Sequence, residues 1–227
     1  MRKSIGRDQI VEAAFRLLDE VGLEGASLRK LACELGIRAP SLYWHFKSKQ
    51  ALIHAMADAL IEDVARDIPE GQPWRATLMQ VAHEFRRGFK RHRDGARVYA
   101  GTYLATENVL RVGEAVIGAL AQAGAPAEFA GTAGMHLVYY VMGFVIEEQA
   151  LPDYQNFEEV GRDFLALSQA RFPYCWQARG LLTDPDFDRR FEEGVGLVLD
   201  GIEHALAQAR AQAGGTRTGP TPAAGSA

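Results

Sequence analysis

The first fifty residues contain three short stretches in which apolar positions recur every three or four residues. In residues 7–21 this spacing gives one apolar helical face and one charged face, and Gly22 suits the helix end. A second helix is expected after Ser27, which can cap it, and it should stop at Gly36. A third is expected around Pro40, with Ala39 as its cap. The pattern predicts three helices in fifty residues.

The remainder of the chain shows the same periodicity in longer stretches. A fourth helix is expected from Ser48 to about residue 67, because PEGQP then interrupts the pattern and would end a helix. Further helices are expected at residues 74–91, 94–99, 106–123, 127–149, 157–170 and 185–211. Alternating β-branched runs are rare, so we predict an all-α fold.

The second and third helices are separated by a very short turn. The segment from Ser27 to Lys49 reads SLRKLACELGIRAPSLYWHFKSK, and the turn lies around Gly36 and Ile37. Glycine accepts the left-handed backbone that such a turn requires. Two short helices joined in this way form a helix-turn-helix, whose second helix enters the major groove of DNA.

Helix pairs joined by glycine are also common in all-α proteins that bind no DNA. Here, however, Tyr43, Trp44 and His45 follow one another, and a helix cannot bury three consecutive residues against one partner. At least one of them should face outward, while Leu42 and Phe46 should pack onto the core. This arrangement favours a DNA-binding role.

Charge is distributed unequally along the chain. The formal net charge is −4, but residues 1–50 hold nine Lys/Arg and six Asp/Glu, which leaves +3 there and −7 in the remainder. A basic N-terminal region suits a protein that contacts a polyanion at one end. The basic run RRGFKRHR at residues 86–93 is expected to be a solvated face.

Composition excludes several other classes of protein. Cys33 and Cys175 lack the spacing of a disulfide framework or a zinc site, and MRKSIGRDQI does not read as a signal peptide. We expect no apolar run long enough to span a bilayer. The sequence therefore predicts a cytoplasmic protein with no cofactor, no bound metal and no membrane contact.

No catalytic pattern is recognisable. GxSxG, GxGxxG and Gly-Lys-Ser/Thr loops are absent from the sequence. His83, His92 and His136 do not have metalloprotease spacing, and they are expected to be structural residues. Glu147 and Glu148 adjoin each other, so their carboxylates should diverge around the helix. We predict that the protein is not an enzyme.

The segment LRKLACELGIRAPSLYWHFKSKQALIHAMADAL resembles the DNA-binding segment of the TetR family of transcriptional regulators, and LYWHFKSK is its most specific part. The resemblance implies a homodimer that binds a pseudo-palindromic operator in double-stranded DNA and is released when a small molecule binds the larger domain. The base contacts that it implies are Arg29, Arg38, Ala39, Pro40, Ser41 and Tyr43. The phosphate contacts that it implies are Ser27, Trp44, His45 and Lys49.

A weaker similarity to the tetracycline repressor branch continues to about residue 150. Phe85, Thr102 and Glu147 match the residues that hold the drug and its magnesium in that branch. Other such positions are replaced by Ala65, Val81, Tyr99 and Tyr139. Since the branch has a metal-binding imidazole where this chain has Tyr99, and a phenol is a poor ligand for a divalent cation, we predict that magnesium–tetracycline does not bind.

Aromatic and methionine side chains at helical spacing indicate an effector cavity for a flat, largely apolar molecule. The predicted effector-binding residues are Phe85, Phe89, Tyr99, Thr102, Tyr103, Met135, Tyr139, Met142 and Glu147. Further candidates for the lining are Tyr140, Phe144 and Trp176, with His83 and His136 as polar groups. The same spacing is typical of a plain helical core, and this alternative stays open.

These predictions define three regions and two main functional hypotheses. Residues 1–50 are expected to bind DNA, residues 51–210 to bind the effector and dimerise through helices 127–149 and 185–211, and residues 211–227 to form a disordered tail. The leading hypothesis is a repressor released by a small aromatic or hydrophobic effector, with the fourth helix as the lever. The alternative is a helical small-molecule-binding protein with a vestigial DNA head. A helical enzyme is a third hypothesis, against which the absence of a recognisable catalytic pattern argues.

Overall fold

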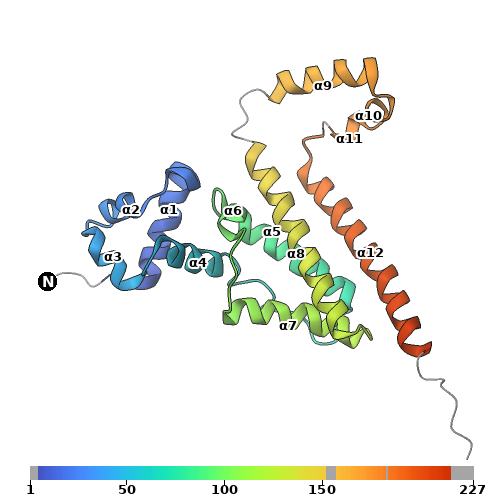
Figure 1. The fold of residues 1–227 in the computed structure, drawn as a ribbon, viewed down its shortest axis with the longest axis horizontal. Coiled ribbons are helices and arrows are strands. Elements are labelled where there is room, and N and C mark those ends of the chain that lie inside the picture. Colours follow the sequence, from blue (N-terminus) through green and yellow to red (C-terminus); the bar gives the residue numbers. More distant parts are fainter. Residues whose placement is uncertain (1–4, 152–156, 183, 216–227) are drawn as a thin grey trace, which may run out of the picture.

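The computed structural model describes residues 5–151, 157–182 and 184–215, and these contain helices and no strand. The prediction of an all-α fold is confirmed. The helices are α1 (Arg7–Gly25), α2 (Leu28–Glu34), α3 (Ala39–His45), α4 (Lys49–Leu60), α5 (Trp74–Lys90), α6 (Gly95–Tyr99), α7 (Glu107–Gln122), α8 (Ala127–Ala150), α9 (Phe157–Arg171), α10 (Pro173–Gln177), α11 (Arg179–Leu182) and α12 (Phe187–Gly215). Figure 1 shows α1–α3, which we call the reading head, at one end of the molecule, with α4 leading into a larger body of α5–α8 and α12.

The reading head is held together by one apolar residue or more from each of its helices. Ile10 and Leu18 of α1, Leu31 of α2 and Leu42 of α3 are each at most 1% exposed, and Phe46 just after α3 is 2% exposed. Burying a side chain of this kind contributes about 1.5–3 kcal/mol. The expectation that Leu42 and Phe46 pack onto the core is confirmed.

Local hydrogen bonds fix where the helices of the reading head begin. The Ser27 hydroxyl accepts a hydrogen bond from the Lys30 amide at 3.2 Å, and the Ser48 hydroxyl accepts one from the Ala51 amide at 3.1 Å. The cap predicted at Ser27 is therefore confirmed, and so is the start of the fourth helix at Ser48, whose hydroxyl caps it. The cap predicted for α3 was wrong by one residue, because Arg38 occupies the N-cap and Ala39 is already helical.

Helix α1 does not end where the sequence suggested. Gly22 has a left-handed backbone with φ of 68°, and it kinks α1 without ending it, so that the helix resumes and reaches Gly25. A side chain at position 22 would also lie 3.2 Å from the Asp94 carboxylate. The glycine therefore serves both the bend and a close approach to the body.

Helix α4 was predicted to reach residue 67, and this was wrong. The helix ends at Leu60, and the guanidinium of Arg111 on α7 donates hydrogen bonds to the carbonyls of Ile61, Glu62 and Val64 at 3.2, 2.7 and 3.1 Å. These carbonyls are therefore bound by a residue some fifty positions away in the sequence. Helical periodicity alone cannot reveal such a contact.

Helix α8 is the centre of the body. It packs against α5, α7, α6 and α12, and its Leu137, Val141 and Val145 are fully buried. In the described residues it is the one helix whose length and composition would allow it to cross a membrane, so the expectation that no such run exists was wrong. It packs against four other helices of the body with part of its apolar surface and leaves the rest exposed.

Helices α9, α10 and α11 lie beyond the upper ends of α8 and α12, at the top of Figure 1. Helices α10 and α11 were not predicted, and α10 packs against α9 and α11. Trp176 lies in α10, where the Arg179 guanidinium stacks 4.2 Å from its ring, so its suggested place in the cavity was wrong. Helix α12 continues to Gly215 and includes residues 211–215 of the predicted tail, whereas residues 216–227 lie outside the described part.

The basic run at residues 86–93 is only partly solvated. Arg86 is 8% exposed and pairs with Glu148 and Asp188, and His92 stacks on Phe15 with 4.0 Å between ring centroids. The prediction of a solvated face was therefore wrong for these two residues. His92 bonds Asp19, as a structural histidine should.

Candidate DNA-binding and effector sites

The residues predicted to contact DNA share the exposed surface of α2, α3 and the turns beside them. Nine of the ten are exposed: Ser27, Arg29, Arg38, Pro40, Ser41, Tyr43, Trp44, His45 and Lys49. Ala39 is half-buried. Trp44 is 91% exposed and Tyr43 51%, so these large side chains contribute little to the core. The structure brings the predicted base and phosphate contacts together, while their roles on DNA stay predictions.

The turn between α2 and α3 has the geometry of a helix-turn-helix. Gly36 takes a left-handed backbone with φ of 64°, and the amide of Ile37 donates to the carbonyl of Ala32 at 3.0 Å. This combination closes α2 and redirects the chain into α3. Lys49 has a structural contact as well, because its ammonium donates to the Ala26 carbonyl at 3.3 Å.

Two reciprocal hydrogen bonds join α1 to the turn between α5 and α6. The Asp19 carboxylate accepts a hydrogen bond from the Arg93 amide at 2.8 Å, and the Asp94 carboxylate accepts one from the Leu23 amide at 2.8 Å. His92 also bonds Asp19 at 2.9 Å. We call this set the α1 clamp. It connects the reading head to the body separately from α4.

Helix α8 of the body contacts the other side of the same turn through the side chain of Gln149. The side-chain amide of Gln149 on α8 donates to the carbonyls of Phe89 and His92 at 3.1 and 2.8 Å. Its oxygen accepts a hydrogen bond from the Ala96 amide at 3.3 Å. The turn is thus fixed from both sides, and α6 follows directly after it.

Two substitutions of Asp94 measure how much the α1 clamp contributes to the stability of the protein. Asp94 has a left-handed backbone with φ of 57°, which Asp and Asn tolerate better than Ala. We expect Asp94→Ala to lower the free energy of unfolding by about 2 kcal/mol, since it strains the backbone and leaves the Leu23 amide without its acceptor. Asp94→Asn keeps both features and should cost less than half as much. Urea unfolding of both variants measures this, and equal losses would contradict the role of the clamp.

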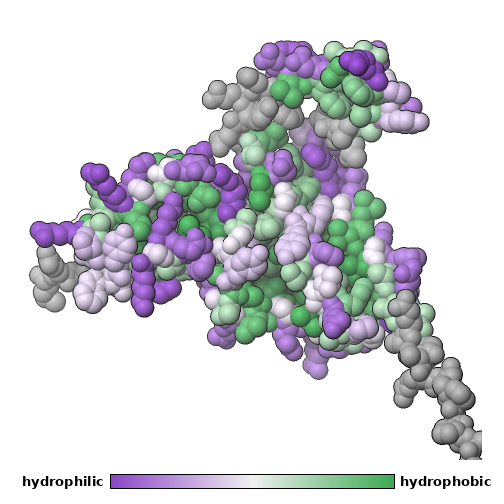
Figure 2. All heavy atoms as spheres, viewed as in Figure 1, coloured by the Kyte–Doolittle hydropathy of each residue, from purple (hydrophilic) through white to green (hydrophobic). Residues whose placement is uncertain are grey.

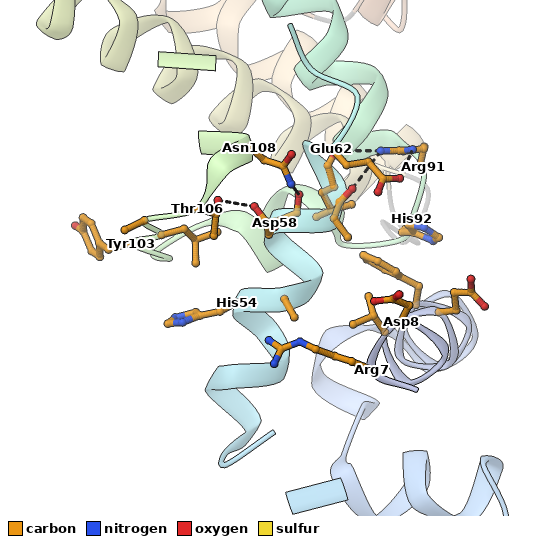
Figure 3. Close-up of a pocket in the computed structure, with 18 residues that line it drawn as sticks. Arg7, Asp8, His54, Asp58, Glu62, Arg91, His92, Tyr103, Thr106 and Asn108 are labelled. Carbon is orange, nitrogen blue, oxygen red and sulfur yellow. Dashed lines mark hydrogen bonds and ion pairs between the residues drawn. The ribbon is translucent and has the colours of Figure 1, made fainter. Parts of the chain in front are cut away.

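A polar cleft of about 630 Å³ lies between α1, α4 and the segment that follows α6. His54 and Asp58 of α4 line this cleft together with Arg7 and Asp8 of α1, and Figure 3 shows the Arg7 side chain reaching toward α4. The Thr106 hydroxyl donates to the Asp58 carboxylate at 2.5 Å, and the Asn108 amide donates to the Asp58 carbonyl at 3.5 Å. The start of α7 is therefore bonded directly to α4.

A second, apolar cavity of about 500 Å³ lies between α6, α7 and α8 of the body and opens to solvent, since Tyr103, Met135 and Tyr139 of its lining are exposed. Six of the predicted effector-binding residues line it: Phe85, Tyr99, Thr102, Tyr103, Met135 and Tyr139. Tyr103, Leu104 and Ala105 line the polar cleft as well as the apolar cavity. This non-helical segment is a wall shared by the two hollows.

Three predicted effector-binding residues do not line the cavity. Phe89 is fully buried and packs beside Tyr99 with 5.1 Å between ring centroids, while Met142 and Glu147 lie one turn or more beyond the lining residues of α8. The cavity also has aliphatic and glycine residues that the prediction missed, namely Ile61, Val109, Val112, Gly113, Val116, Gly131, Gly134 and Val138. Such residues occur throughout helical cores and give no distinguishing signal in a sequence.

Tyr99 is the most buried of the three tyrosines that line the cavity. Burial, and to a lesser degree the negative charge of Asp58, raise the pKa of its phenol above the ordinary value of about 10. The phenol is therefore protonated at neutral pH and can donate a hydrogen bond. In the described part of the chain, no three His, Cys, Asp or Glu side chains lie close enough together to hold a metal ion.

An exposed helix-turn-helix joined to a helical body with an apolar cavity is the arrangement of a ligand-responsive DNA-binding regulator. Residues 10–56 match the model of the bacterial regulatory proteins of the tetR family, and residues 68–206 match the tetracyclin repressor-like C-terminal domain. The chain belongs to the TetR family of bacterial transcriptional regulators, which are not enzymes.

Relatives support this assignment along nearly the whole chain. The class C tetracycline repressor of Escherichia coli is 36% identical over 200 residues, which cover 87% of this chain and 90% of the relative. A possible TetR family regulator from Streptomyces coelicolor is 32% identical with a TM-score of 0.79, over 88% of this chain and all of that one. ActR of Streptomyces coelicolor, solved with actinorhodin, is 26% identical with a TM-score of 0.79, over 90% and 98%.

Proposed function

We propose that this regulator is a homodimeric repressor that binds a pseudo-palindromic operator and leaves it when a small aromatic or hydrophobic effector fills the apolar cavity. The observation that carries the proposal is the shared wall at Tyr103–Ala105, which borders both the cavity and the cleft beside α4. A ligand that displaces this wall acts on the bonds between Thr106, Asn108 and Asp58. Such a ligand binds the released conformation more tightly and shifts the population toward it.

The dimer is proposed to form through α8 and α12. Leu197 of α12 is 73% exposed, and Gly201 and His204 follow it on the same side of the helix. Figure 2 shows apolar surface along the middle of α12. A second copy would cover it, and two heads related by two-fold symmetry would read two half-sites of one operator. Sedimentation equilibrium should then give twice the mass of the chain.

The effector class is proposed from the lining of the cavity and from the similarity to ActR, which has been solved with actinorhodin. Magnesium–tetracycline is not expected to bind, because Tyr99 offers a neutral phenol where a metal ligand would be needed. A protein that acts on chromosomal operators works in the cytoplasm, and this is the location that we propose.

Replacing Tyr43 tests the function. An operator is first selected from random duplexes with the wild-type protein, and its affinity is then compared with that of Tyr43→Ala. We expect at least a tenfold loss, because Tyr43 lies on the exposed face of the recognition helix α3. Tyr174→Ala is the matched control, since Tyr174 is 83% exposed in α10 and far from the head, and it should bind as tightly as the wild type.

The same experiment distinguishes the alternative of a small-molecule-binding protein with a vestigial DNA head. Under that alternative no sequence is enriched in the selection, and Tyr43→Ala binds duplex DNA as the wild type does. The alternative has no structural observation of its own in its favour, because the head keeps a packed core, a capped α2 and an exposed recognition surface.

A further inference from the structure

The apolar cavity offers almost no charge to a molecule bound inside it. Its lining in the described part of the chain includes no acidic, basic or imidazole side chain. An ion bound against this lining would give up part of its hydration without gaining a partner of opposite charge, which is unfavourable. Asp58, the acid that influences Tyr99, is itself bonded by Thr106 and belongs to the cleft on the other side of the wall.

Only four lining side chains carry polar atoms, and they are not equivalent. The Thr102 hydroxyl donates to the Tyr99 carbonyl at 2.6 Å, so its proton is engaged. Tyr103 is 93% exposed and points outward in Figure 3, and Tyr139 is 51% exposed at the mouth. Tyr99 is therefore the most buried tyrosine among the described lining residues, and burial raises the pKa of its phenol, which stays protonated.

The walls of the cavity favour a flat occupant. Gly113 of α7 and Gly131 of α8 both line it, and a Cβ atom added at either position would meet nothing within 4 Å. Two helices therefore present bare backbone to the space. Phe85 meets the Tyr99 ring edge to face, at 6.2 Å between centroids, so aromatic surface is available at the deep end.

We infer that the effector is an uncharged, planar aromatic molecule with a carbonyl or similar acceptor oxygen, which the Tyr99 hydroxyl binds without a metal ion. The inference rests on the proposed function of this cavity as the effector site. It makes Tyr99 the specificity-determining residue, because a hydrogen-bond donor in an apolar site discriminates strongly against a ligand that lacks the acceptor.

Four rigid tricyclic probes separate shape, acceptor and charge. Xanthone is neutral and has a ring carbonyl, xanthene lacks that carbonyl, xanthone-2-carboxylate is an anion, and 9-aminoacridine is a cation at neutral pH. Isothermal titration of the purified protein with each probe should show that xanthone binds at least tenfold more tightly than the other three. Absence of xanthone binding, or equal binding of either charged probe, would overturn the inference.

Replacing Tyr99 by phenylalanine tests its role directly. Tyr99→Phe should weaken xanthone about five- to tenfold and leave the affinity for xanthene unchanged, because only xanthone accepts the hydrogen bond. Equal weakening of both probes would show that Tyr99 acts only through packing and would overturn its assignment.

A cavity-filling variant locates the bound probe. Gly113→Leu places a side chain in the cavity and should abolish xanthone binding, while Gly161→Leu, on α9 and equally unobstructed, should leave it unchanged. Undiminished xanthone binding by Gly113→Leu would overturn the inference. The affinity of the wild type for its operator is measured in the same series. A wild type that binds its operator but not xanthone contradicts only the inferred class of ligand. A wild type that recognises no operator contradicts the proposed function instead.

Discussion

Glu148→Gln should lower the free energy of unfolding by about 3 kcal/mol, because it removes the charge that balances a buried guanidinium. Arg86 is 8% exposed, and its Nε and Nη2 atoms donate to the two Glu148 oxygens at 2.9 and 2.7 Å. Lys90 donates to the same carboxylate, and Asp188 of α12 pairs with Arg86. The cluster therefore ties α5, α8 and α12 together.

Acid should remove the same stabilisation from the wild type. Burial by itself raises the pKa of Glu148, but the hydrogen bonds from Arg86 and Lys90 outweigh this and leave the pKa below its ordinary value. A carboxyl whose pKa is lower in the folded state stabilises the protein above its unfolded pKa of about 4.3, and the contribution is lost as the pH falls through the folded value. Glu148→Gln should therefore lose less stability than the wild type below pH 5.

The neighbouring Glu147 provides the control for this prediction. It is exposed, and the substitution Glu147→Gln removes the same charge one position away. Urea unfolding at pH 7 and at pH 4, at one fixed protein concentration, should show a loss below about 0.5 kcal/mol for this variant. Similar losses of stability for Glu148→Gln and Glu147→Gln would mean that the change in net charge, and not the loss of the buried ion pair, causes the destabilisation.

Arg29→Ala should reduce the affinity for the selected operator about a hundredfold. Arg29 is exposed on α2 and is one of the base contacts that the family resemblance implies, and an arginine can bond guanine bidentately in the major groove. Losing such a contact costs about 1.4 kcal/mol, or tenfold, for each head, and both heads of the proposed dimer lose it. The preference for one base in each half-site should also be relaxed.

Lys30→Ala is the matched control, because it removes one positive charge from the adjacent exposed position. Fluorescence anisotropy with specific and random duplexes at two salt concentrations distinguishes the two effects. We expect the two variants to bind random DNA alike and to differ on the operator. If both weaken the operator equally, Arg29 contributes only charge and its base contact is refuted.

The reading head could be predicted almost completely from the sequence because its determinants are local. Ser27 and Ser48 cap the helices that directly follow them, and Gly36 forms the turn within its own few residues. The run of Tyr43 and Trp44 could not be buried on one face, and both are exposed. Each of these features depends on residues within a few positions of one another.

The effector cavity could be predicted only in part. Phe85, Tyr99 and Met135 were found because large aromatic or sulfur-containing side chains stand out in a helical pattern. Phe89 has the same appearance in the sequence, but it packs in the layer behind the cavity and is fully buried. Gly113 opens the space by having no side chain, and its place in the cavity lining follows only from the packing of α7 against α8.

The sequence by itself determined the helical class and the exposed surface of the helix-turn-helix, because residue type and short-range spacing carry this information, and its resemblance to the tetracycline repressor branch showed that Tyr99 replaces an imidazole. Only the tertiary structure decided that α4 stops at Leu60, that Arg86 is buried, and that one segment separates the cavity from the cleft. Arg111 binds carbonyls about fifty residues away, and Arg86 pairs with Glu148 at a separation of 62 residues. Contacts of this range arise when helices pack, since packing sets which distant groups share a space from which water is excluded.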